Sequence, residues 1–139
     1  MTARYRRITM LGEPSDTQGL DANRRARCSF NIQAKKDPSE EFEEELAKIL
    51  ENGGIAAGVI FAGTASTLPE LADVTDPAII TIVSTGGSAP EEIHNEIGAY
   101  PQPSAQLTAR HKHYRIARAL AYQAYNALKV IRNEIITTP

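Results

Sequence analysis

Two stretches of the chain alternate between apolar and polar positions, which is the pattern of a strand with one buried face. The longer stretch is 25–34, and the shorter is 105–110, where alanine and leucine alternate with polar side chains up to Arg110. In both stretches we expect the apolar side chains to point into a core. In 25–34 these inward positions are Ala26, Cys28, Phe30, Ile32 and Ala34.

Apolar runs at 5–11, 55–62 and 78–83 predict three further strands. The first is expected to form a hairpin with 25–34, because the residues between them are rich in Gly, Pro, Asp and Asn. Gly86-Gly87 and Pro90 predict the end of the third run. Residues 86–103 are therefore expected to form a long polar loop between two paired strands.

Two amphipathic helices are also predicted. Asp37-Pro38-Ser39-Glu40 is typical of a helix start, an apolar stripe runs from Phe42 to Leu50, and Gly53-Gly54 ends the helix. The second helix is expected from Tyr114 to near Asn133, since the β-branched residues that follow favour extended structure. Its apolar face is Ile116, Ala117, Leu120, Ala121, Ala124, Leu128 and Ile131.

The length of 139 residues suits a single domain. No apolar run approaches eighteen residues, so we expect no membrane span. The sequence after Met1-Thr2-Ala3 is charged, and this predicts no signal peptide. Cys28 is the only cysteine, which excludes an internal disulfide.

The net charge of −2 conceals a segregated pattern. Residues 1–36 carry eight Lys or Arg against three Asp or Glu, residues 37–102 carry one against thirteen, and residues 103–139 carry six against one. Blocks of opposite sign suit head-to-tail self-association or a charged partner. Solvated faces on an ordinary domain would give the same composition.

Candidate catalytic and metal-binding groups are few. His111 and His113 would share a face on a strand and could bind a metal, but no second cluster of ligands accompanies them, and two surface histidines are the favoured interpretation. The third histidine, His94, lies in the expected loop. Ser84-Thr85-Gly86-Gly87 lacks the spacing and the lysine of a phosphate-binding loop. Cys28 is expected in the core. We therefore predict no catalytic, cofactor or metal residues and no enzyme.

The first thirty residues contain six arginines that could bind nucleic acid phosphates: Arg4, Arg6, Arg7, Arg24, Arg25 and Arg27. Few aromatic residues accompany them, and no helix-turn-helix, zinc or OB-type signature is present. A small nucleic-acid-binding α+β module that uses this hairpin is therefore the alternative to an arginine-rich protein interface.

Three motifs in order, IITIVSTGG, AYPQPSAQLTAR and YRIARALAYQAYNAL, give the chain a family resemblance. The chain resembles the tail terminator and head–tail joining minor capsid proteins of long-tailed bacteriophages over roughly 39–135. In that family an apolar strand ends in a TGG-type turn, and a Pro-containing segment leads to a strand that ends in arginine, here Arg110. An alanine-rich helix follows, and its AYNAL-like stretch is Ala124 to Leu128 here.

The order of the motifs departs from the family pattern. The family begins with the acidic helix and ends with a β-hairpin, whereas here the similar hairpin, with Leu20-Asp21-Ala22-Asn23-Arg24, comes first. We therefore hypothesise a circular permutant of a single domain, in which 1–36 is the hairpin part and 37–139 is the helix–sheet–helix part. The hypothesis predicts that Thr2 and Pro139 lie close together.

The resemblance implies an α+β fold, with a mostly antiparallel β-sheet, an extended β-hairpin and two α-helices packed on one face. It also implies a structural protein of the virion tail and neck, assembled in the bacterial host cytoplasm. Such a protein forms a ring that caps the tail tube, ends tube polymerisation and joins tail to head. No cofactor and no membrane are implied.

The partners that the resemblance implies are other copies of the chain, in a ring typically of six, the tail tube protein and a head-completion or connector protein. DNA would pass through the ring lumen without specific recognition. Basic patches would then meet the acidic segment of a neighbouring copy. The candidate interface residues are Arg24, Arg25, Arg27, Arg110, Arg115, Arg118, Glu41, Glu44 and Glu45.

Overall fold

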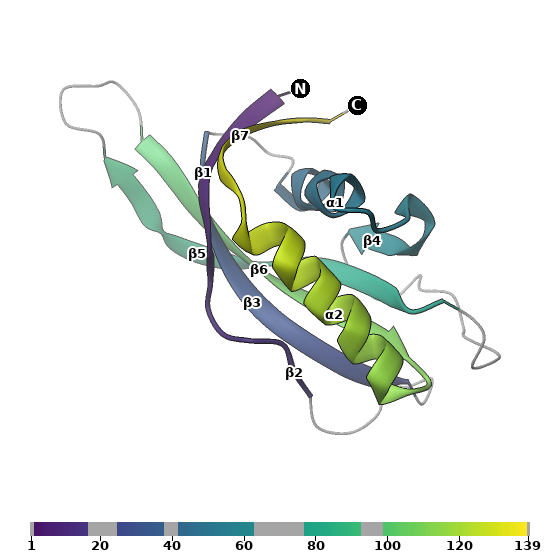
Figure 1. The fold of residues 1–139 in the computed structure, drawn as a ribbon. Helices are drawn as coiled ribbons and strands as arrows, with labels where there is room; N and C mark the ends of the chain where they lie inside the picture. The colour runs from purple at the N-terminus through teal and green to yellow at the C-terminus, as the bar shows by residue number, and fades with distance from the viewer. Residues whose placement is uncertain (1, 17–24, 38–41, 63–76, 93–98, 139) are drawn as a thin grey trace.

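The computed structural model describes residues 2–16, 25–37, 42–62, 77–92 and 99–138, and they form an α+β fold (Figure 1). Six strands make a curled sheet in the order β4-β5-β6-β3-β1-β7, and the short strand β2 pairs with β3 in line with β1. Every pairing is antiparallel except that of β4 with β5. The strands are β1 (Thr2–Met10), β2 (Ser15–Asp16), β3 (Ala26–Lys36), β4 (Ile60–Ala62), β5 (Ile79–Glu92), β6 (Ala99–His111) and β7 (Arg132–Thr137).

Both helices, α1 (Phe42–Asn52) and α2 (Tyr114–Lys129), pack on the same face of the sheet, as predicted (Figure 1). Helix α2 packs on the central strands β3 and β6, whereas α1 contacts β5 and the two edge strands β4 and β7. The sheet therefore curls around α1. The inward positions predicted for β3 are all buried. Phe30, Ile32 and Ala34 belong to the main apolar core, and Phe30 meets Tyr125 of α2 edge-on at a centroid distance of 5.8 Å.

Small residues let α2 approach the sheet closely. Ala117 and Ala121 are fully buried against Cys28 of β3 and Ala109 of β6. The prediction that Cys28 belongs to the core is confirmed, since its side chain has no exposed surface. Ile116 is the exception on the predicted apolar face, because 38% of its surface is exposed.

The predicted loop at 86–103 was wrong. Strand β5 continues to Glu92 and β6 begins at Ala99, and the two pair along this length. Two register shifts, between Ser84 and Gly86 and between Ser88 and Glu91, explain how the expected strand breakers fit. Gly86 and Gly87 supply the positive φ that a bulge requires, and Pro90 lies within the second shift, where a missing N–H is tolerated.

This extension forms a two-stranded arm. Pairing of β3 with β6 stops at Ser104, and pairing of β4 with β5 stops at Ile82. Beyond these points, among the residues that the structure describes, Gly86–Glu92 and Ala99–Pro103 pair only with each other. We call these two segments the arm; its far end projects at the upper left of Figure 1. Pro101 and Pro103 fit here because this side of β6 lacks a partner strand.

Two element boundaries also differ from expectation. In place of a buried strand over 55–62, a 3-10 turn at Ala57–Val59 precedes the short edge strand β4, because the Ala-Ala-Gly stretch lacks the β-branched side chains that favour strands. Helix α2 ends at Lys129 rather than near Asn133, because β7 begins at Arg132 and pairs with β1. The expected extended structure after the helix is confirmed by β7.

The two ends of the described chain lie side by side (Figure 1). Thr2 of β1 is the register partner of Thr137 of β7. Pro139, which the permutation hypothesis places next to Thr2, lies outside the described residues. The circular permutation itself stays a hypothesis.

Candidate interaction surfaces

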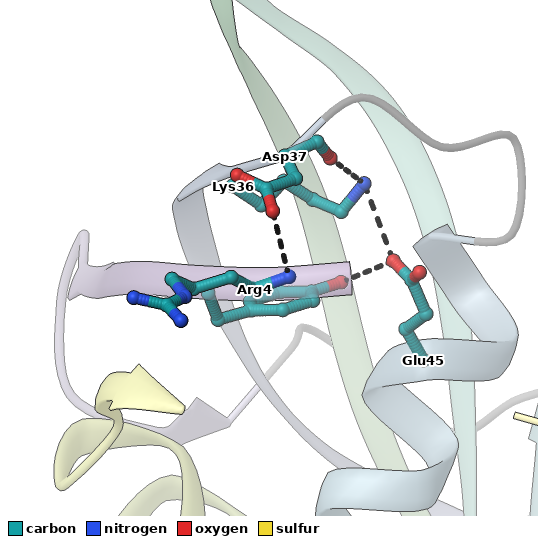
Figure 2. A network of polar contacts seen from close by, with 5 residues as sticks. Arg4, Lys36, Asp37 and Glu45 are labelled. Carbon is teal, nitrogen blue, oxygen red and sulfur yellow. Dashed lines mark hydrogen bonds and ion pairs between the residues drawn. The ribbon is translucent and has the colours of Figure 1, made fainter. Parts of the chain in front are cut away.

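A buried polar network joins the β1–β3 hairpin to helix α1 (Figure 2). Oε1 of Glu45 accepts a hydrogen bond from the Tyr5 hydroxyl at 2.8 Å and lies 3.2 Å from Nζ of Lys36. The Lys36 and Glu45 side chains are 1% and 0% exposed. Lys36 also donates to the Asp37 backbone carbonyl at 2.9 Å and lies over the Tyr5 ring, 5.6 Å from its centroid. The charges are therefore paired as well as buried, as buried ions require.

Burial raises the pKa of the Tyr5 phenol well above its ordinary value, and the Glu45 carboxylate raises it further through its negative charge and its hydrogen bond. Next to this group, Asp37 and Arg4 bind each other through the Asp37 N–H to the Arg4 carbonyl at 2.9 Å. The Arg4 N–H donates to Oδ2 of Asp37 at 3.3 Å. The network fixes the end of β3 and the position of α1, and its Lys36 and Glu45 side chains are buried away from any substrate.

The histidine pair is divided between interior and surface. His111 is fully buried, contrary to the expectation of two surface histidines, while His113 is exposed. Nδ1 of His111 accepts a hydrogen bond from the His113 backbone N–H at 2.9 Å, so this nitrogen is not free to bind a metal. Among the described residues no group of three His, Cys, Asp or Glu could hold a metal ion, and His94 lies outside them.

The sheet face away from the helices carries a polar row across three strands. Oγ of Ser29 and Oγ1 of Thr108 are 2.9 Å apart, and Thr81 donates to the Thr108 carbonyl at 3.2 Å. Arg110 donates to the Thr81 hydroxyl, and its register partner on β3 is Arg27. All three hydroxyl groups belong to buried residues and bond within the row, so the row is cross-strand pairing rather than a nucleophilic site.

Among the described residues, the exposed side of α2 has the composition most typical of a protein–protein interface. The helix contains no Asp or Glu, and Arg115 and Arg118 are exposed in its first two turns. These arginines lie with Tyr114 and Tyr122 around a shallow hollow of 360 Å³, and the Arg118 guanidinium stacks 5.1 Å from the Tyr122 ring centroid. Tyrosine and arginine are the residue types that dominate binding energy at protein interfaces. We call these four residues the α2 patch.

Cations near the start of α2 are unfavourable to the helix itself, because the helix dipole is positive at that end. His113 occupies the cap position without a side-chain cap, and no acidic residue lies in the first turn. The α2 patch therefore carries a positive charge that the described part of its own helix does not offset.

The structure separates the predicted interface residues into several places. Arg115, Arg118 and Glu44 are exposed on the helix layer, whereas Arg27 and Arg110 are half-buried on the opposite face of the sheet. Arg25 is only 4% exposed. Glu45 is fully buried in the network, so as an interface residue it is corrected: it faces the core because it shares the apolar stripe of α1 with Leu46 and Ile49. Arg24 and Glu41 lie outside the described residues.

The sequence analysis missed Lys36 and Tyr5. The alternation of β3 contained a signal, because continuing it from Ala34 places Lys36 on the inward face, where a lysine needs a buried partner. Glu45 likewise lies at i+3 from Phe42 on the apolar face of α1. A basic and an acidic residue, each on the buried face of its own element, indicate that each needs a buried partner, although the pattern does not name that partner.

No helix in the described ranges has the length and apolar character needed to cross a membrane. No protein-family model, curated protein or solved structure matches the chain.

Proposed function

We propose that the chain is a structural assembly protein of a phage tail, which associates head-to-tail into a ring at the end of the tail tube. It acts by binding and not by turnover. In this role it ends polymerisation of the tube protein and presents a surface to a head-completion or connector protein, while DNA passes through the lumen. The sequence resemblance suggests this function, and the fold class that the resemblance implies is the observed one.

The observation that carries the proposal is the separation of charge along the molecule. Residues 49–109, which include the arm of the β5–β6 hairpin, contain no Lys or Arg, whereas α2 contains no Asp or Glu. The far end of that hairpin and the start of α2 lie at opposite ends of the sheet (Figure 1). Opposite charges at opposite ends favour heterologous contacts, which close into a ring if the rotation between copies permits.

The nucleic-acid-binding alternative has less support. Of the arginines proposed to bind phosphates, Arg25 is buried and Arg27 and Arg6 are only partly exposed. Among the candidate arginines that the structure describes, Arg4 and Arg7 are exposed on β1, and two arginines are fewer than the several phosphate contacts of a typical nucleic-acid interface.

The test is the size and shape of the purified protein. We expect light scattering after size exclusion to give a mass near six times 15.1 kDa, and electron microscopy to show closed rings with a central hole. A monomeric protein that binds duplex oligonucleotide, with an affinity that falls steeply as salt rises, would favour the nucleic-acid-binding alternative.

A further inference from the structure

The arm has an unusual structural position. It is a ribbon of two strands, and its pairs beyond Gly86↔Ser104 have no third strand in the described part of the chain. A two-stranded ribbon is marginally stable in water unless it packs against something else. A persistent arm of this kind therefore gains stability from a surface on which it can dock.

The sequence of the arm is acidic. It contains Glu91 and Glu92 at the register positions opposite Tyr100 and Ala99, and it contains no Lys or Arg. The docking surface that fits it is therefore cationic.

The α2 patch is such a surface. Arg115 and Arg118 are exposed there, and Tyr114, which is 37% exposed, and Tyr122 add the apolar contact area that a β-ribbon can cover. The adjoining hollow beside α2 is lined by Ile116, Ala119 and Leu120 and has a volume of 350 Å³. Aromatic and apolar area with two arginines at its edge is the composition of an interface centre.

The arm cannot reach the α2 patch of its own chain. Strand β6 runs straight from the arm at Ala99 to His111, three residues before α2 begins. Thirteen residues at about 3.3 Å each place the arm tip and the start of α2 about 40 Å apart. Figure 1 shows them at opposite ends of the molecule. A contact between arm and patch must therefore be made between two copies.

We infer that the acidic arm of one copy docks on the cationic α2 patch of the next. This inference deepens the proposed function and rests on it, because it names the contact by which copies associate head-to-tail. Each copy then uses its arm on one neighbour and its patch on the other.

The test uses charge reversal in the full chain. E91K/E92K and R115E/R118E are each expected to raise the dissociation constant for self-association at least about tenfold, because like charges then face each other. The quadruple variant restores the wild-type mass. An equimolar mixture of the two double variants also associates, and more strongly than either variant alone, because each arm then meets a patch of opposite sign.

Matched controls carry the same charge changes elsewhere. E44K/E51K on α1 and K129E/R132E, at the last residue of α2 and the first of β7, alter exposed residues outside the contact, and both are expected to keep the wild-type mass. Circular dichroism and thermal unfolding establish that every variant is folded.

Several results would overturn the inference. The first is a wild-type protein that stays monomeric up to about 1 mM. The second is an assembly whose mass neither double reversal changes. The third is that R115E/R118E loses binding to an oligonucleotide while its self-association is unchanged. The last would identify nucleic acid as the occupant of the patch. A closed pair of copies that both reversals dissociate would support the arm–patch contact and refute the ring. A ring that neither reversal affects would refute the contact alone.

Discussion

The buried pair of Lys36 and Glu45 allows a prediction about stability that separates the pair from its two halves. Lys36→Met leaves the Glu45 carboxylate buried without its ammonium partner, although the Tyr5 hydroxyl still donates to it (Figure 2). Glu45→Gln leaves the Lys36 ammonium with the Asp37 carbonyl. The double variant removes both charges, yet the Gln side chain still offers an oxygen to Tyr5.

Removal of one partner from a buried ion pair costs about 3 to 5 kcal/mol, because the other charge is left without compensation. Here each side keeps at least one hydrogen bond, so we expect the loss of unfolding free energy in each single variant to lie at the lower end of this range, about 3 kcal/mol. The double variant should lie within about 1 kcal/mol of the wild type, since an uncharged replacement of a buried pair is nearly neutral. The double-mutant cycle would then give a coupling of about 5 kcal/mol, a third or more of the stability of a typical domain.

The measurement is urea unfolding followed by circular dichroism at 222 nm, with all four proteins at one pH and one salt concentration. Glu44→Gln is the control, because the neighbouring Glu44 is exposed and should change the free energy by less than about 0.5 kcal/mol. Single variants that each cost below about 1 kcal/mol and add up in the double variant would refute the reasoning. The Lys36–Glu45 pair would then be no stronger than a surface ion pair.

Three further predictions concern other parts of the fold. Because the pKa of Tyr5 is raised, the native protein holds the phenolic proton above pH 10 while the unfolded chain releases it. The difference in unfolding free energy between wild type and Tyr5→Phe should therefore be constant below pH 10 and shrink by about 1.4 kcal/mol per pH unit above it. Urea unfolding of both proteins at pH 8 and 11 measures this difference. A Cβ at Gly87, where φ is 132°, would collide with the Gln102 carbonyl, whereas a Cβ at Gly86, where φ is 98°, would face open space. Gly87→Ala should therefore increase amide hydrogen exchange in the arm more than Gly86→Ala does. Equal exchange in both variants would contradict the close pairing. Ala121→Leu should cost about 2 kcal/mol because it overfills the tight contact between α2 and the sheet, and the exposed Ala119→Leu is its control in thermal unfolding.

Periodicity in the sequence predicted most of the body of the fold. The alternation of β3, the apolar stripe of α1 and the hairpin of β1 with β3 all depend on patterns within single elements, and the structure confirms them. The arm escaped prediction because Gly86-Gly87 and Pro90 are strand breakers in an isolated chain. Their effect changes when bulges place them at irregular register positions, and the sequence does not show those bulges in advance.

The candidate surfaces were only partly predictable, since burial depends on how elements meet. Exposure of Arg115 and Arg118 follows from the amphipathic pattern of α2. The burial of Arg25 and of His111 depends on packing between elements that lie far apart in the sequence. The pairing of Lys36 with Glu45 needed knowledge of how α1 sits over β1 and β3. A local pattern can place a side chain on a face but cannot name its partner.

The pairing of Thr2 with Thr137 has a consequence for how the chain folds. Strand β1 is synthesised first and β7 last, so two neighbours in the sheet are separated by 135 positions along the chain. Such distant pairings slow folding, because a large loop must close before any contact compensates for its lost entropy. Until β7 leaves the ribosome, one edge of β1 lacks its native partner and can pair wrongly. A short peptide link between the two ends would turn the slowest pairing of the fold into a local hairpin, and stopped-flow refolding should then be faster.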